Sequence, residues 1–211
     1  LFSEKQYPSF SKNEFNRQTL CRAVLMIEVP RENREIILKR LLESCGLKEQ
    51  EDFFKSLYFL EAPLELQSLA EEGIRTNVEN VFDAIALNNP YPTKFLSEGA
   101  WNQMVLKAIF MGRPLYKIYD LLERNSLNLA LIVNDYIKER WAANREVSPE
   151  IWQLLSDYKH PDLEMSLEKA KTSKSELERR AIELVLREPS KEKVSKTKAW
   201  LELGIEFNQN K

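Results

Sequence analysis

The sequence predicts an all-α protein, built as a single irregular α-α superhelix or helical bundle of about ten helices. Glycine is scarce, with five in 211 residues, and helix-favouring Leu, Glu, Lys and Ala are plentiful. The Asn-Gly and Asp-Gly pairs typical of β-hairpins do not occur. HEAT-like stacking of helix pairs would fit this pattern, although no repeat period is recognisable.

In the first half of the chain, apolar residues recur at helical spacing between proline and glycine breakers. Pro30 ends the first helix, Gly46 follows the second, and Thr76 is placed to cap the fifth. The segment Asn89-Pro90-Tyr91-Pro92 is expected to be extended, because proline disfavours helical backbone in the residue before it. The predicted helices span residues 13–28, 31–44, 49–61, 64–72 and 77–88.

In the second half, the same pattern predicts helices over residues 97–111, 115–123, 127–144 and 149–157. Ser148 and Pro149 form a strong start signal for the last of these. Residues 162–205 are more charged and carry shorter apolar faces. We therefore expect a main helical domain over residues 1–160 and a helical C-terminal extension, 161–211, packed on the same domain.

The composition and charge of the chain argue against several classes of function. The chain has 31 basic and 33 acidic residues and a net charge of -2, which argues against a nucleic-acid partner. Its two cysteines, Cys21 and Cys45, lack the short spacing of a zinc site, so we expect no metal centre. No apolar run reaches the roughly 18 residues of a membrane span. A cytoplasmic protein without direct membrane insertion is expected.

The stretch from Trp101 to Phe110 is too apolar for an ordinary surface helix. On a helical wheel only Gln103 and Lys107 form a polar wedge, and Asn102 falls inside the apolar arc. A buried amide without partners costs on the order of 1–3 kcal/mol. Asn102 is therefore expected to bind backbone, another side chain or a ligand, and this helix predicts a buried polar site.

The helix over residues 127–144 shows a similar anomaly, because Arg140 projects into its apolar arc. A buried guanidinium needs an anionic or carbonyl partner, either a carboxylate of a neighbouring helix or a ligand anion. With Asn102, Arg140 makes a candidate two-helix site. Trp101, Trp141 and Trp152 recur in the same region, as core residues or as walls of a ligand pocket.

Three further groups could carry acid-base chemistry, and each also has an ordinary structural explanation. Desolvation could lower the pKa of Lys107, or this lysine could be an ordinary surface residue. Asp135 and Glu139 are four residues apart, as in a carboxylate pair, but such pairs commonly form a solvated face. His160, the only histidine, has no serine or thiol motif beside it.

Several segments together resemble the EboA family of bacterial proteins. The resemblance is carried by Glu72-Gly73-Ile74-Arg75-Thr76-Asn77, Asn89-Pro90-Tyr91-Pro92, Trp101-Asn102-Gln103-Met104-Val105-Leu106-Lys107-Ala108, Glu139-Arg140-Trp141-Ala142-Ala143 and Val147-Ser148-Pro149-Glu150-Ile151-Trp152. EboA-like proteins belong to a gene cluster linked to the trafficking or maturation of small secondary metabolites. The resemblance implies a helical cytoplasmic protein that works beside the other proteins of that cluster.

The leading hypothesis is a metabolite-binding or adaptor protein with no catalytic residues, no metal and no cofactor. Its ligand site would be lined by Arg75, Asn77, Asn102, Lys107, Glu139 and Arg140. Two alternatives stay open. One is an enzyme acting on a small polar or anionic metabolite, with Lys107 or Glu139 as acid or base and Arg140 as an anion clamp. The other is a protein-interaction scaffold with an exposed apolar surface.

Overall fold

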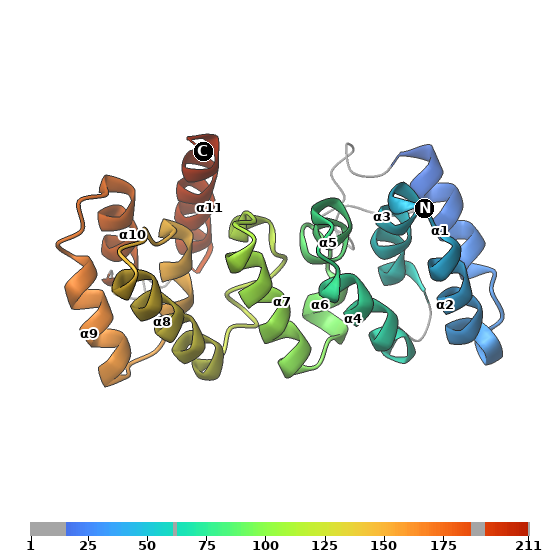
Figure 1. Ribbon diagram of the computed structural model, residues 1–211, viewed down its shortest axis with the longest axis horizontal. Helices are drawn as coiled ribbons and strands as arrows, with labels where there is room; N and C mark the ends of the chain where they lie inside the picture. The colour runs from blue at the N-terminus through green and yellow to red at the C-terminus, as the bar shows by residue number, and fades with distance from the viewer. Residues whose placement is uncertain (1–15, 61–62, 187–192, 211) are drawn as a thin grey trace. The chain divides into compact units, whose positions relative to one another are not determined.

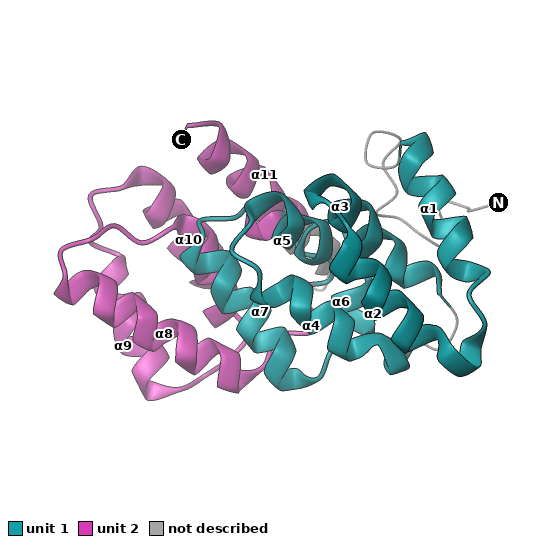
Figure 2. Cartoon of the chain, turned by 45° about the vertical axis from the view of Figure 1, so that its right-hand side comes forward, with its two compact units in different colours: residues 1–113, 117–120 teal, residues 114–116, 121–211 magenta. Residues whose placement is uncertain are grey.

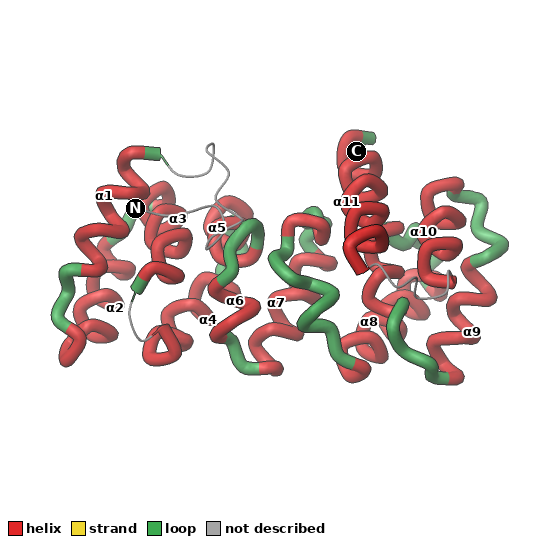
Figure 3. Tube along the Cα trace, turned by 180° about the vertical axis from the view of Figure 1, so that it is seen from behind, coloured by secondary structure: helices red, strands yellow, loops and turns green. Residues whose placement is uncertain are grey.

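The computed structural model describes residues 16–60, 63–186 and 193–210, and every regular element in these ranges is a helix (Figures 1 and 3). Eleven α-helices and five short 3-10 helices follow one another along the described chain. The all-α class predicted from the sequence is confirmed. Figure 3 shows that loops and turns alone connect these helices.

The chain divides into two compact units, coloured separately in Figure 2. Unit 1 contains residues 1–113 and 117–120, and unit 2 contains residues 114–116 and 121–211. This division does not coincide with the predicted domain boundary at residue 160, which stays a prediction. None of the helices in the described parts of either unit has the length and apolar character that crossing a bilayer requires.

Unit 1 is organised around α3, which packs against α1 on one side and α5 on the other. Phe53 and Phe54 of α3 are almost completely buried and meet edge to face, with ring centroids 5.4 Å apart. The helices of unit 1 are α1 Arg17–Ile27, η1 Arg31–Asn33, α2 Arg34–Ser44, α3 Leu47–Ser56, η2 Leu57–Phe59, η3 Pro63–Leu66, α4 Gln67–Arg75, α5 Glu79–Ala86, α6 Tyr91–Phe95 and α7 Glu98–Phe110.

Unit 2 is organised around η5, a 3-10 helix in which all seven residues are buried. The predicted start at Pro149 is confirmed, but the helix has 3-10 winding, and it packs against α8, α10 and α11. Trp152 at its centre donates a 3.1 Å hydrogen bond from Nε1 to Glu178. The helices of unit 2 are α8 Leu127–Ala142, η5 Pro149–Leu155, α9 Pro161–Ala170, α10 Glu176–Leu186 and α11 Lys193–Gln209.

The expectation of an extended segment at residues 89–92 was wrong, because α6 begins at Tyr91. Asn89 Oδ1 accepts a 2.9 Å hydrogen bond from Tyr91 N and so turns the chain into the helix. Pro90 and Pro92 lie at the start of α6. Backbone N–H groups in the first turn have no partner within the helix, so proline, which lacks an N–H, is tolerated there.

The helix predicted over residues 115–123 was also wrong. Only η4 Leu115–Lys117 forms, and Asp120 lies in the left-handed region with a φ of 49°. A residue in the left-handed region cannot continue a right-handed α-helix, so Asp120 interrupts the predicted segment.

Gly73 of α4 lies against the Phe54 ring, so a Cβ added at this position would come within 2.7 Å of a ring carbon. The Gly73→Ala variant should be destabilised by about 1–2 kcal/mol, because overpacking outweighs the gain in helix propensity. Urea unfolding measures this difference.

Gly99→Ala is the matched control, because a Cβ at Gly99 of α7 meets no atom within 4 Å. It should stabilise unit 1 by roughly 0.5 kcal/mol through helix propensity alone. Equal effects of the two alanines would contradict the close contact between Gly73 and Phe54.

Candidate functional site

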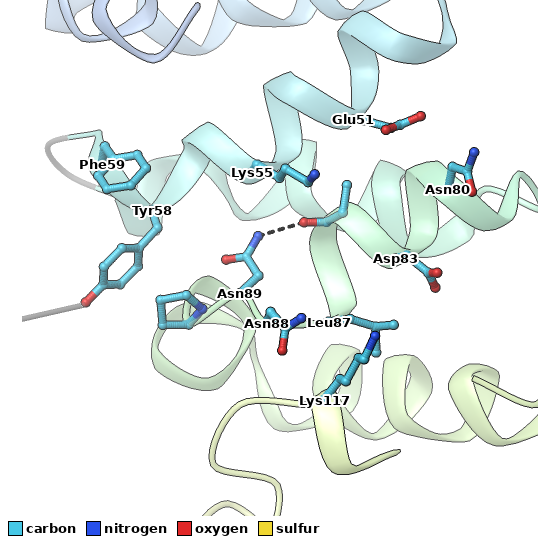
Figure 4. Close-up of a pocket in the computed structure, with 12 residues that line it drawn as sticks. Glu51, Lys55, Tyr58, Phe59, Asn80, Asp83, Leu87, Asn88, Asn89 and Lys117 are labelled. Atoms are coloured by element: carbon cyan, nitrogen blue, oxygen red, sulfur yellow. Dashed lines mark hydrogen bonds between the residues drawn. The ribbon is translucent and has the colours of Figure 1, made fainter. Parts of the chain in front are cut away.

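Unit 1 contains a pocket of about 220 Å³ between α3, α5, the 88–90 turn and Lys117 (Figure 4). Hydrocarbon from Tyr58, Phe59 and Leu87 forms part of its wall. The polar side chains that line it are Glu51, Lys55, Tyr58, Asn80, Asp83, Asn88, Asn89 and Lys117.

The buried side chain of Asn89 builds one end of the pocket. Its Nδ2 donates to Phe54 O of α3 at 3.1 Å and to Ala84 O of α5 at 3.0 Å. Its Oδ1 accepts from Tyr91 N at the start of α6. Figure 4 shows the amide directed at α5. One side chain therefore joins three helices where they border the pocket.

The neighbouring Asn88 adopts a left-handed conformation, with a φ of 51°. Asparagine tolerates this conformation better than most residues. Its N–H donates a 2.7 Å hydrogen bond to Lys117 O, which ties the end of η4 to the pocket. The backbone turn at Asn88 thus brings the otherwise distant Lys117 to the lining.

Both signs of charge face the pocket. Asp83 is paired with Arg113, which donates from Nε to Asp83 Oδ1 at 2.8 Å and from Nη2 to Oδ2. This hydrogen bonding raises the pKa of Arg113. Glu51 pairs with Lys48 at 2.6 Å. Lys55 and Lys117 supply ammonium groups, and Figure 4 shows Lys55 extending toward the side where Glu51, Asn80 and Asp83 lie.

None of the four predicted site residues in unit 1 lines this pocket. Lys107 Nζ instead donates to Arg75 O at 2.8 Å and Thr76 O at 2.7 Å, at the C-terminal end of α4. Of the two alternatives for Lys107, desolvation applies, and it lowers the pKa of this lysine. Arg75 and Asn77 are exposed, and Arg75 pairs with Glu71 at 3.5 Å. Lys107 therefore fastens α7 to α4.

Asn102 is buried, as its place on the helical wheel predicted, with 6% of its surface exposed. Its Oδ1 has no hydrogen-bond partner among residues 16–60, 63–186 and 193–210. The partner expected from the sequence is therefore not found for this oxygen within the described ranges.

The two predicted site residues of unit 2 are Glu139 and Arg140, and neither is fully buried. The expectation of a buried guanidinium at Arg140 was wrong, since its side chain is partly exposed. Its Nε and Nη2 donate to Glu146 O at 3.0 and 2.7 Å, a carbonyl partner that closes the turn after α8. Glu139 is exposed. Because Asn102 and Arg140 belong to different units, their convergence on one site stays a prediction.

Among the other sequence candidates, His160, Trp101 and Trp152 have structural roles. His160 caps α9, where Nδ1 accepts from Asp162 N at 3.3 Å. Trp101 and Trp152 are completely buried, which confirms the core interpretation for these two, and Trp141 is partly exposed. No cluster of three or more His, Cys, Asp or Glu in the described chain could hold a metal ion.

Sequence reasoning missed the residues that line the pocket, although one signal pointed there. The sequence predicts an extended segment at Asn89-Pro90-Tyr91-Pro92, whereas an asparagine before proline often builds a turn with side-chain hydrogen bonds. The polar residues of α3 and α5 carry no comparable signal, because they match any solvated helix face.

Asn89→Ala should destabilise the protein by at least about 2 kcal/mol, because it leaves two buried carbonyls and one N–H without the amide. Chemical denaturation followed by circular dichroism gives the difference. Asn77→Ala, an exposed asparagine of the same unit, should change stability by less than about 0.5 kcal/mol. Similar losses in both variants would show that the bridge is not important for stability.

Tyr91 is fully buried, and burial raises the pKa of its hydroxyl far above the ordinary value of about 10. Above about pH 10 the unfolded chain releases a proton that the folded chain keeps, so stability falls as pH rises. Between about pH 9 and pH 11, the wild type should lose about 1 kcal/mol more than Tyr91→Phe. Urea unfolding at both pH values tests this, and parallel losses would refute it.

Comparison with known proteins gives one match. A model of the EboA family, described as metabolite traffic protein EboA, matches residues 4–156. Neither the curated proteins nor the solved structures give a match to this chain. The pocket of unit 1 lies entirely within the matched residues. Since the match covers more than half of its length, the chain belongs to the EboA family of metabolite traffic proteins.

Proposed function

We propose that the protein binds a small polar metabolite in the pocket of unit 1 and serves metabolite traffic as a binding or adaptor component without catalysis of its own. The observation that carries this proposal is the pocket itself, which lies within the residues that match the family. In this proposal the protein works in the cytoplasm beside the other proteins of its gene cluster.

The lining favours a ligand that has both hydrogen-bonding and charged groups. Amides of Asn80 and Asn88, the ammonium groups of Lys55 and Lys117 and the carboxylates of Glu51 and Asp83 all border one small volume. A polyhydroxylated or zwitterionic metabolite can hydrogen-bond to donors and acceptors of both signs, whereas an apolar ligand would make no such contacts with them. The volume of about 220 Å³ limits the ligand to a small molecule.

The pocket is also preorganised, which supports binding. Asn89 fixes the ends of α3 and α5, and the pair with Arg113 holds the Asp83 side chain of α5 in place. A ligand that enters walls already held in place orders few side chains, so less conformational entropy opposes binding.

The enzyme alternative would use Lys107 or Glu139 as an acid or base. Lys107 Nζ already donates to two backbone carbonyls, so proton transfer would require that it leave the end of α4. Its role in fastening two helices favours the binding proposal. Turnover of a metabolite by the purified protein, lost on Lys107→Ala, would favour the enzyme instead.

The proposal is tested by ligand-observed NMR on the full chain with small amino acids, sugars and sugar phosphates as probes. For a probe that binds, Lys55→Met should weaken binding by about tenfold, because one charged hydrogen bond is worth roughly 1.5–3 kcal/mol. Methionine keeps the length of the side chain and removes the charge.

Lys39→Met is the matched control, since Lys39 is an exposed lysine of α2 outside the pocket. It should leave the affinity unchanged. The proposal fails if no probe binds, or if the two variants weaken binding equally. Stable capture of the other cluster proteins without any metabolite binding would instead favour the scaffold alternative.

A further inference from the structure

We propose that unit 2 carries a second ligand site, a groove that binds a small aromatic anion. The groove has a volume of about 620 Å³, within the range of about 300–1,000 Å³ common for ligand pockets. It lies between the end of α8, the 144–149 turn, the 173–175 turn, α10 and α11. All its residues belong to unit 2, so the proposal is independent of the pocket in unit 1.

One wall of the groove is aromatic and apolar. Trp141, Leu177 and Phe207 line it and are each only partly buried. The Trp141 ring lies 6.0 Å from the ring of Trp152, which is completely buried. Trp152 is in turn fixed by its hydrogen bond to Glu178. Trp141 is therefore backed by an anchored ring, and a ligand ring can pack against this wall.

Three cationic side chains line the groove together with this apolar wall. Arg145, Lys169 and Lys174 line the groove with exposed side chains, and Lys169 Nζ lies 4.2 Å from the centre of the Trp141 ring. Within the described ranges none of these three forms an ion pair with a carboxylate of the chain. A cation that contacts an aromatic face beside an apolar wall is well placed to meet an anionic group attached to a ring.

Two carboxylates, Glu146 and Glu178, also line the groove, but the three cations outnumber them. Glu178 is 7% exposed and accepts hydrogen bonds from Trp152 Nε1 and Ser173 Oγ, so both oxygens are engaged. Glu146 is exposed. Arg179 adds positive charge at the 173–174 turn, where Nη1 donates to Ser173 O at 2.7 Å and Lys174 O at 3.0 Å.

The residues that line the groove indicate which chemical class of ligand it would bind. A purely apolar molecule would leave the cations unused, and a small inorganic anion would leave the wall of Trp141, Leu177 and Phe207 exposed. An aromatic carboxylate, sulfonate or phosphate satisfies both parts of the groove.

The test uses the four tryptophans of the chain as reporters. In the ¹⁵N-labelled full chain, Trp141→Phe identifies the indole signal of Trp141 by its loss. Titration of the wild type with naphthalene-2-sulfonate should shift that signal in a saturable way. The uncharged 2-naphthalenemethanol and the ring-free methanesulfonate should each bind about tenfold more weakly or not at all.

Reversal of the charges gives the second measurement. The double variant Lys169→Glu and Lys174→Glu should weaken naphthalene-2-sulfonate binding by about tenfold, since two attractive contacts become repulsive. Lys159→Glu, an exposed lysine of the same unit outside the groove, should have no effect, and neither should Lys55→Met of unit 1. Retention of the other indole signals shows that each variant is folded.

Several results would overturn the proposal. Among them are equal binding of the charged and uncharged naphthalenes, unchanged affinity in the double lysine variant, and shifts confined to tryptophans other than Trp141. A response to methanesulfonate as strong as that to naphthalene-2-sulfonate would mean that the groove recognises an anion and not a ring, and would also count against it.

Discussion

The structure of unit 1 depends on one buried amide. Asn89 connects α3, α5 and the start of α6 through three hydrogen bonds to backbone atoms. These groups lie where helices end and cannot all be paired by the helices themselves. Because burial leaves no water to replace the amide, its position fixes the helix ends, and those ends in turn shape the pocket lined by Lys55, Asn80 and Lys117.

Cations at the ends of helices follow the same principle. Lys107 donates to the last carbonyls of α4, and Arg140 donates to Glu146 O beyond the end of α8. A positive side chain is favourable there, because exposed carbonyls and the helix dipole both place negative charge at a C-terminus. Lys107 and Arg140, for which the sequence offered an acid-base role and an anion-binding role, are therefore used to hold the chain together.

The two pockets suit ligands of different chemistry. The pocket of unit 1 offers amides with both signs of charge in a small volume, whereas the groove of unit 2 combines a wide aromatic wall with exposed cations. The family match covers the whole of the first and only the part of the second up to residue 156. We infer that polar ligand binding belongs to the matched part of the chain, and that α10 and α11 complete a site of another kind.

The sequence alone determined the all-α class, most helix positions and the burial of Asn102, because scarce glycine and apolar spacing are local properties. It also showed the family through Asn89-Pro90-Tyr91-Pro92 and similar motifs. Only the tertiary structure decided that Asn89 starts α6, that η5 has 3-10 winding and that Lys107 binds α4. It also brought Lys55, Asn80 and Lys117 to one pocket, since each looks like an ordinary surface residue until backbone contacts over long sequence separations place it.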